Sequence, residues 1–249
     1  MTRQQVAAPG ALAIAERLAA ERPAFHGHVG EETVWNLVPE ALRLIAGVVE
    51  EGDRTLEVGS GASTVVFVAA GGRHTAISPF ADEHRRIREY LAGAGIDDGR
   101  LETIAGRSQE ILPTLELPEP VDVALIDGLH KFPHPAVDFH YAARLLRVGG
   151  SLLLDDVPIP SVGVVFRFLR TDPGWQLVDV AGDRVALFRK LSEPAGGDDW
   201  GAQPFNARMD YGFVAPWRRV RLRARDGVTG LAGRNPWMGR ARRRLTGRG

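Results

Sequence analysis

The sequence predicts an α/β fold, in which a doubly wound, mostly parallel sheet of seven strands carries helices on both faces and ends in an antiparallel hairpin. Three observations support this prediction. Short β-type runs alternate with helix-type stretches from Arg54 to Lys190, as expected of parallel strands joined by crossover helices. A glycine-rich turn follows the first β-type run directly. The last two β-type runs are joined only by Ala181-Gly182-Asp183, which is too short for a helical crossover and predicts a hairpin at the sheet edge.

The elements follow from this alternation. The predicted strands are Thr55–Val58, His74–Ile77, Leu101–Ile104, Val121–Ile126, Ser151–Leu154, Gln176–Val180 and Arg184–Phe188. The predicted helices between them are Ser63–Ala70, Ala81–Ala92, Ser108–Leu115, Pro135–Arg147 and Pro160–Arg170. Ahead of this core, Val38–Val49 has apolar residues at helical spacing, so we expect a helix that packs on the sheet near the mouth of a ligand site.

The composition is ordinary for a globular protein, with 249 residues of which 44% are hydrophobic and 25% charged. There is no cysteine, which excludes disulfides, Cys-ligated zinc and thiol nucleophiles. The chemistry must therefore use carboxylates, histidines or hydroxyls. No apolar run approaches the roughly 18 to 20 residues that span a bilayer, and the N-terminus does not resemble a signal peptide, so we expect a cytoplasmic protein without a transmembrane segment.

The charge is unevenly distributed although the net charge is zero. From Arg208 to Gly249 there are twelve arginines and two acids, so this tail carries +10 and the remaining chain −10. Arg219–Arg225 alternates arginine with apolar residues, which as a strand would place every arginine on one face. Trp217 and Trp237 flank this run, and anionic lipid, nucleic acid, an acidic acceptor or the acidic core are all conceivable partners. A solvated tail without a partner is the alternative.

The glycine-rich turn carries the first chemical motif, Glu57-Val58-Gly59-Ser60-Gly61-Ala62-Ser63-Thr64. Glycines permit a tight strand-to-helix turn and let a ligand approach the backbone, while the helix N-terminus offers free N–H groups. The turn has an acid near the end of the strand and lacks the third glycine of the dinucleotide fingerprint. This combination favours a ligand with an amino group over a pyrophosphate. A plain turn with Ser63 as helix N-cap is the alternative.

This loop resembles the E/D-x-G-x-G motif of class I S-adenosylmethionine (SAM)-dependent methyltransferases, and the predicted strand order resembles their Rossmann-like plan. The resemblance implies that SAM is the cofactor and that Glu57, Gly59, Ser60, Gly61 and Ser63 bind it.

Two further cofactor contacts are expected from the resemblance. The family usually places an acid at the end of the second strand to hold the ribose hydroxyls, but this chain has Ser78 there. Asp82 or Glu83 in the following helix are candidates to replace that acid, or they serve only the helix dipole. Ser108 follows the third strand in a segment that resembles the one bracketing adenine, and it is otherwise an N-cap.

Three carboxylates follow two predicted neighbouring strands: Asp127 comes after Val121–Ile126, and Asp155 and Asp156 come after Ser151–Leu154. The carboxyl ends of parallel strands meet at one rim, where ligands of open α/β sheets collect. Like charges repel unless they are protonated or bound to a cation, and oxygen ligands suit Mg²⁺. The pattern resembles metal-dependent O-methyltransferases of the catechol and antibiotic-sugar types. It implies that the three aspartates bind Mg²⁺ or a similar divalent cation, with a strand-terminating turn as the alternative for the Asp155-Asp156 pair.

His130 is the candidate general base, because it lies three positions after Asp127, where catechol-type enzymes carry a lysine. The resemblance gives Asp127 a catalytic role as well, beside cofactor and metal. A loop histidine bonded to backbone is the alternative for His130. His26 and His28 form a short H-x-H motif, which is weak evidence for a second metal site.

Taken together, these motifs predict a methyltransferase that acts on a hydroxyl of a small molecule or sugar with Mg²⁺ assistance. We expect a helical cap over residues 1–50, a SAM-binding core over 51–191, and a linker with an Arg-rich extension over 192–249. A homo-oligomer is compatible with the sequence. The alternatives are metal-independent methylation of oxygen or nitrogen, a methyltransferase-like binding module without catalysis, and an adaptor whose basic tail is the functional part.

Overall fold

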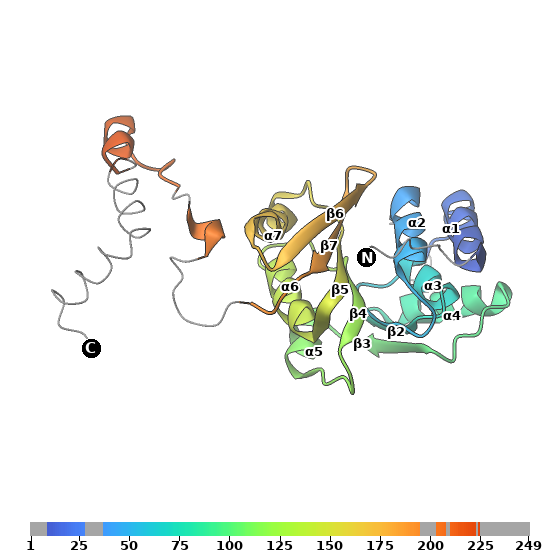
Figure 1. Ribbon diagram of the computed structural model, residues 1–249. Coiled ribbons are helices and arrows are strands. Elements are labelled where there is room, and N and C mark those ends of the chain that lie inside the picture. Colours follow the sequence, from blue (N-terminus) through green and yellow to red (C-terminus); the bar gives the residue numbers. More distant parts are fainter. Residues whose placement is uncertain (1–8, 28–36, 195–202, 208–209, 223, 225–249) are drawn as a thin grey trace. The chain divides into compact units, whose positions relative to one another are not determined.

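The computed structural model describes residues 9–27, 37–194, 203–207, 210–222 and 224. The chain divides into two compact units, residues 1–197 and 198–249, which we describe separately. The first unit contains the sheet (Figure 1). Its strands are β1 (Arg54–Val58), β2 (Arg73–Ser78), β3 (Leu101–Ala105), β4 (Val121–Ile126), β5 (Leu146–Leu154), β6 (Trp175–Ala181) and β7 (Val185–Lys190).

The seven strands form one sheet in the order β3-β2-β1-β4-β5-β7-β6. Strands β1 to β5 pair in parallel, and β7 runs antiparallel to both β5 and β6. The predicted α/β class and the C-terminal hairpin are therefore confirmed. The strand order reverses between β1 and β4, and in open α/β sheets the crevice at such a switch point is where ligands bind.

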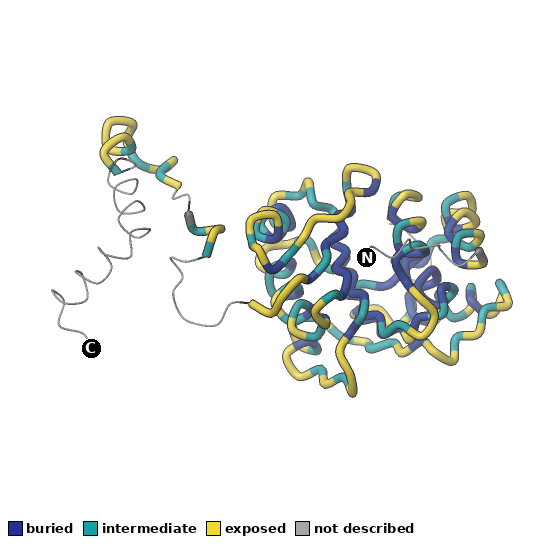
Figure 2. Tube along the Cα trace, in the orientation of Figure 1, coloured by how far each residue is buried: buried dark blue, intermediate teal, exposed yellow. Residues whose placement is uncertain are grey.

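Helices cover both faces of the sheet, as predicted (Figure 1). They are α1 (Pro9–Glu21), α2 (Pro39–Val48), α3 (Ala62–Ala69), α4 (Ala81–Gly93), α5 (Ser108–Ile111), α6 (His134–Leu145) and α7 (Pro160–Thr171), with a 3₁₀ turn η1 (Leu112–Thr114) after α5. Successive residues of a strand point to opposite faces. In β4, Val123 and Leu125 accordingly pack with α1 to α4, while Ala124 and Ile126 pack with α6 and α7. Figure 2 shows the buried strands between these two layers.

Helix α1 was not among the helices predicted individually, although residues 1–50 were expected to be helical. Ala11, Ala15 and Leu18 are buried and join the same apolar cluster as α2 and α3. Two of these three residues are alanines, so the apolar stripe of α1 is weak in the sequence. The start of α2 lies near the carboxyl rim of the sheet, since Val38 lies against Gly182 in the β6–β7 turn.

Two boundaries differ from the prediction. The helix expected to reach Arg147 ends at Leu145, because Leu146 is buried in an extended conformation and pairs with Val121. Strand β5 therefore starts five residues earlier than the predicted Ser151. Helix α5 stops at Ile111 and tightens into η1, in which Pro113 lacks the N–H that would continue the α-helix.

In the second unit, η3 (Pro204–Ala207) is followed by a helix over residues 216–222. Arg219, Val220, Arg221 and Leu222 lie in this helix, so the strand considered for the Arg-rich run is wrong for these residues. Pro216 stands at the helix start, where a proline is tolerated. Trp237 and His28, which the sequence singled out, lie outside the described residues. Within the described part of the chain, no helix has both the length and the apolar character to cross a membrane.

Candidate cofactor and acceptor site

The glycine-rich loop joins β1 to α3 at the carboxyl rim of the sheet. Gly59 has a φ of +118°, and a Cβ at this position would collide with the main-chain carbonyl of Asp127. The N–H of Gly59 donates to the carbonyl of Ile77 (2.9 Å), and the N–H of Asp127 donates to the carbonyl of Val58 (2.8 Å). These bonds join the ends of β1, β2 and β4. The loop predicted to bind the cofactor and the first acid of the rim are therefore direct neighbours.

Glu57 is fully buried behind this loop, on the face of β1 that α3 covers. Its carboxylate accepts hydrogen bonds from Thr64 Oγ1 (2.6 Å), from His74 Nε2 (3.1 Å) and from the hydroxyl of Ser63. Burial would raise the pKa of Glu57, but the bonds from His74, Ser63 and Thr64 outweigh it and hold the pKa below its ordinary value of 4.5. Glu57 and Ser63, both predicted cofactor residues, thus contact each other and tie the loop to α3.

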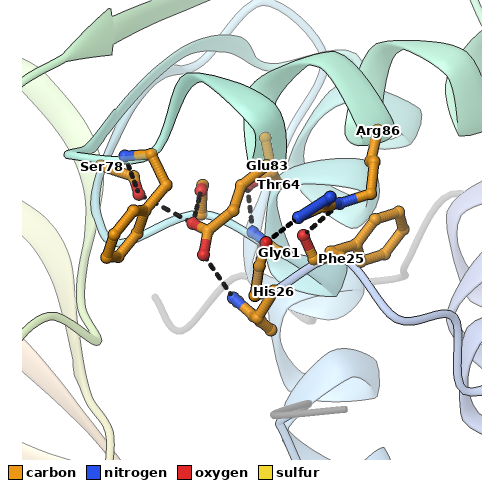
Figure 3. Close-up of polar contacts among 10 residues, drawn as sticks. Phe25, His26, Gly61, Thr64, Ser78, Glu83 and Arg86 are labelled. Atoms are coloured by element: carbon orange, nitrogen blue, oxygen red, sulfur yellow. Dashed lines mark hydrogen bonds and ion pairs between the residues drawn. The ribbon is translucent and has the colours of Figure 1, made fainter. Parts of the chain in front are cut away.

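Ser60 and Ser78, the next two predicted cofactor residues, both contact Glu83. Figure 3 shows Ser78 beside Glu83. Both hydroxyls donate to Glu83 Oε2, at 3.1 Å from Ser60 and 2.8 Å from Ser78. Glu83 lies in the first turn of α4 and is only 4% exposed. Asp82, the other candidate considered for this place, is half exposed and pairs with Arg85 at 3.6 Å. Glu83 is therefore the acid of α4 whose carboxylate lies at the end of β2.

The three predicted metal ligands also lie at this rim. The N–H of Asp155 donates to the carbonyl of Ile126 (3.1 Å), which brings the end of β5 beside that of β4. The side chain of Asp155 is 1% exposed, and those of Asp127 and Asp156 are 25% and 18% exposed. Asp127, His130 and Asp155 offer ligand atoms that all lie within 4.8 Å of one another, and Asp156 is not in this group.

His130 lies between two of these aspartates. Its Nε2 is 3.8 Å from Asp127 Oδ1, and its Nδ1 is 3.5 Å from Asp156 Oδ2. Nε2 is buried and finds no hydrogen-bond partner among the described residues. The alternative for His130 was an imidazole bonded to the backbone. Among the described residues, Nε2 forms no such bond.

Residues 56–157 match the model of a methyltransferase domain family. This part of the chain, from β1 to the end of β5, is similar to methyltransferase domains of the class I SAM-dependent type.

Relatives are consistent with this assignment. A curated protein of Mycolicibacterium vanbaalenii, which carries a provisional O-methyltransferase name, is 34% identical over 107 residues, covering 40% of this chain and 45% of that protein. The chain thus matches less than half the length of this relative. Among solved structures, the O-methyltransferase TomG from Streptomyces achromogenes in complex with SAM has a TM-score of 0.57 at 21% identity, covering 75% of this chain and 92% of that chain. An O-methyltransferase from Bacillus cereus in complex with SAH has a TM-score of 0.52 at 19% identity, covering 75% and 93%. These two structures share the fold.

Arg184 is a residue at the acidic rim that sequence reasoning missed. It precedes β7, and its Nε lies 3.1 Å from Asp155 Oδ1 and 2.6 Å from Asp156 Oδ1. The guanidinium therefore supplies positive charge to the acidic rim from within the chain. Only the antiparallel insertion of β7 beside β5 brings it there, so no local pattern in the sequence indicates this role.

The carboxyl group of Asp127 has a pKa well above its ordinary value of 3.8, because it is desolvated and faces the carboxylate of Asp155, with Glu57 adding to the effect. The charge of Arg184 opposes this shift. The acidic rim therefore holds a close pair of carboxyl groups, Asp127 and Asp155, that favours a shared proton or a bound cation.

Ser108 lies in α5 and Asp138 in α6. Ser108 is the first residue of α5 and the N-cap is Arg107, so the N-cap alternative for Ser108 is wrong. Asp138 of α6 is 1% exposed, and neither carboxylate oxygen has a hydrogen-bond partner in the part of the chain described. Burial raises the pKa of Asp138 to about 6, with smaller opposing effects from Ser108 and His134. Together with Gly128 and His130, Asp138 lines a narrow crevice beside the rim.

Proposed function

We propose that this chain transfers the methyl group of SAM to a hydroxyl of a small molecule or sugar. The observation that carries the proposal is the contact of the glycine-rich loop with the acidic rim, where Gly59 lies against the carbonyl of Asp127. SAM on this loop would lie beside Asp127, with His130 at the same rim. A methyl donor and a candidate base are thus close enough to serve one acceptor.

The chemistry needs few groups. Bound SAM would supply a methyl group for in-line attack by the acceptor oxygen, and the electron pair of the broken carbon–sulfur bond would stay on the sulfur of the departing S-adenosylhomocysteine. The hydroxyl proton goes to His130, whose Nε2 lies 3.8 Å from Asp127 Oδ1, so the carboxyl group of Asp127 stabilises the imidazolium that forms. In this proposal Glu57, Gly59, Ser60, Gly61, Ser63, Ser78 and Ser108 line or support the cofactor site.

A divalent cation such as Mg²⁺ is a second part of the proposal. The donor set of Asp127, His130 and Asp155 fits such an ion, because their ligand atoms lie within 4.8 Å of one another. A bound cation would lower the pKa of a coordinated acceptor hydroxyl. His130 cannot be ligand and base at once, so the base role leaves Asp127 and Asp155 as ligands. Asp156, the third predicted ligand, stays a prediction; its carboxylate lies beside Arg184 and His130.

Metal-independent methylation of oxygen or nitrogen is the second candidate. The pairing of Arg184 with both Asp155 and Asp156 favours it, because this guanidinium already balances charge that a cation would otherwise balance.

The test is methyl transfer from SAM labelled in the methyl group to a panel of phenols, catechols, sugar hydroxyls and amines, with and without EDTA. Transfer to a hydroxyl that His130→Ala reduces about 100-fold or more supports the proposal. Full turnover in EDTA would leave only the metal-independent form. An absence of calorimetric SAM binding would sink the enzymatic proposal and leave a binding module.

The remaining predictions lie outside this test. An anionic partner for the Arg-rich extension, a homo-oligomer and the three-part division at residues 50 and 191 stay predictions.

A further inference from the structure

A short segment before α2, Phe25–Gly27, is fastened to α4, and we call it the strap. Arg86 of α4 donates from Nε to the carbonyl of Phe25 (2.8 Å) and from its terminal nitrogen to the carbonyl of Gly27 (Figure 3). The ring of Phe25 is 2% exposed and meets Tyr90 edge to face, with centroids 5.5 Å apart. Arg86 and Tyr90 follow Glu83 by three and seven positions and so share one face of α4. This face holds the strap in place.

The strap brings His26 to the glycine-rich loop. Its Nδ1 lies 3.2 Å from Glu83 Oε1, and because a carboxylate only accepts, Nδ1 is the donor. The imidazole also packs on the loop, since a Cβ at Gly61 would lie 3.1 Å from His26 Nε2. The side chain of His26 is 13% exposed. A residue far from the loop in sequence therefore becomes part of the wall of the candidate cofactor site.

Glu83 remains able to accept a further hydrogen bond. Burial would raise its pKa, but the bonds from His26, Ser78 and Ser60 outweigh this and hold the pKa below its ordinary value, so the group is ionised at neutral pH. A carboxylate offers roughly four acceptor positions, and the contacts with His26, Ser60 and Ser78 use three of them. Ser60 belongs to the loop and Ser78 ends β2, so the carboxylate lies between the ends of β1 and β2.

We propose that Glu83 accepts a hydrogen bond from one ribose hydroxyl of the cofactor in this chain, and that His26 on the strap is a positioning residue that orients the Glu83 carboxylate. The inference rests on the proposed function. It accounts for Ser78 at the end of β2, where this chain lacks an acid: the carboxylate comes from α4 and Ser78 orients it. It also gives the strap a binding role, because without His26 one of the carboxylate oxygens loses a donor that fixes its direction.

The test compares the calorimetric affinity of the full chain for S-adenosylhomocysteine and for its analogue without the two ribose hydroxyls. The wild type is expected to prefer S-adenosylhomocysteine strongly. Glu83→Gln should weaken S-adenosylhomocysteine binding about tenfold or more while the analogue is little affected, so the ratio of the two affinities falls. His26→Ala should lower the same ratio several-fold, and His26→Asn should restore part of it, because the Asn amide nitrogen replaces Nδ1.

Controls separate this inference from a structural effect and from the proposed function. Arg86→Met should lower the ratio because it releases the strap, whereas Arg85→Met, on the exposed side of the same helix, should not. If Glu83→Gln does not fold, Glu83→Asp keeps the charge with a shorter reach and is expected to lower the ratio in the same way. Wild-type binding with an unchanged ratio in the Glu83 and His26 variants would overturn this inference alone. No binding of S-adenosylhomocysteine by the wild type would overturn the proposed function, and the inference with it.

Discussion

Arg184 forms a two-pronged ion pair with Asp155, its Nε 3.1 Å from Oδ1 and its second nitrogen 3.2 Å from Oδ2. Asp155 is 1% exposed, so the partner of its carboxylate must come from within the protein. The same guanidinium reaches Asp156 at 2.6 Å. Arg184 and a divalent cation therefore compete for the same carboxylates, which makes this arginine the most direct way to examine the metal part of the proposal.

Arg184→Met is expected to lower the free energy of unfolding by about 2 kcal/mol, less than for a fully buried pair because Arg184 is one-third exposed. Millimolar MgCl₂ should then raise the melting temperature of the variant more than that of the wild type, since the acids have lost their internal cation. Thermal unfolding with and without MgCl₂ measures both effects. Arg144→Met, an exposed arginine of α6, is the control and should change neither. Equal responses to MgCl₂ in Arg184→Met and wild type would argue against a cation site at the rim.

The carboxylate of Glu57 makes the stability of the folded protein depend on pH in the acid range. Its pKa is lowered in the folded protein, so its charged form contributes stability above its ordinary value of 4.5, and this contribution is lost as the pH falls through the lowered folded value. Glu57→Gln should destabilise the protein by about 3 kcal/mol at neutral pH and flatten the acid limb of the stability profile. Denaturant unfolding across the acid range measures this. Glu89→Gln on the exposed side of α4 should cost only about 0.5 kcal/mol. An acid limb of wild-type steepness in Glu57→Gln would show that other carboxylates produce it.

The carboxyl group of Asp138 changes the stability with pH in the opposite direction to that of Glu57. Its pKa is raised from 3.8 to about 6 by burial, so the folded state binds more protons between these values and stability falls as the pH rises through this window. Asp138→Asn removes that loss, and it should stabilise the protein by about 3 kcal/mol at neutral pH and by little near pH 4. Melting temperatures of the wild type and of Asp138→Asn at neutral pH and near pH 4 test this prediction. A destabilised Asp138→Asn at neutral pH would show that the ionised carboxylate itself stabilises the fold.

Gly59 and Gly47 form a matched pair of glycines. Gly59→Ala places a Cβ against the carbonyl of Asp127 at a φ of +118°, so it should cost about 3 kcal/mol and weaken cofactor binding by pushing the loop from β4. Gly47 lies in α2, where an added Cβ would meet only open space, so Gly47→Ala should stabilise by about 0.5–1 kcal/mol. Unfolding and calorimetry with S-adenosylhomocysteine measure the two outcomes. Normal cofactor affinity in Gly59→Ala would argue that the loop does not bind the cofactor.

The fold was largely predictable because its signals are local. The alternation of β-type and helix-type runs follows from side chains that must be buried on one or both faces, and the short Ala181–Asp183 link excludes a crossover. The misplaced start of β5 has a non-local cause: Leu146 leaves the helix because Val121 of β4 is available to pair with it. Helix α1 is held by its contacts with α2 and α3 more than by a pronounced apolar stripe of its own.

The sequence by itself determined the α/β fold class, the glycine-rich loop and the meeting of Asp127 with Asp155, because strand ends and turns are specified by neighbouring residues. The methyltransferase class followed from the resemblance of these motifs to a known family. Only the tertiary structure decided the partners of these groups. Glu83 reaches Ser78 from α4, His26 arrives on the strap, and Arg184 enters the acidic rim through the antiparallel β7. Hydrogen bonds and ion pairs act through space over a few ångströms, so residues brought together by packing across the sheet leave no pattern of spacing along the chain.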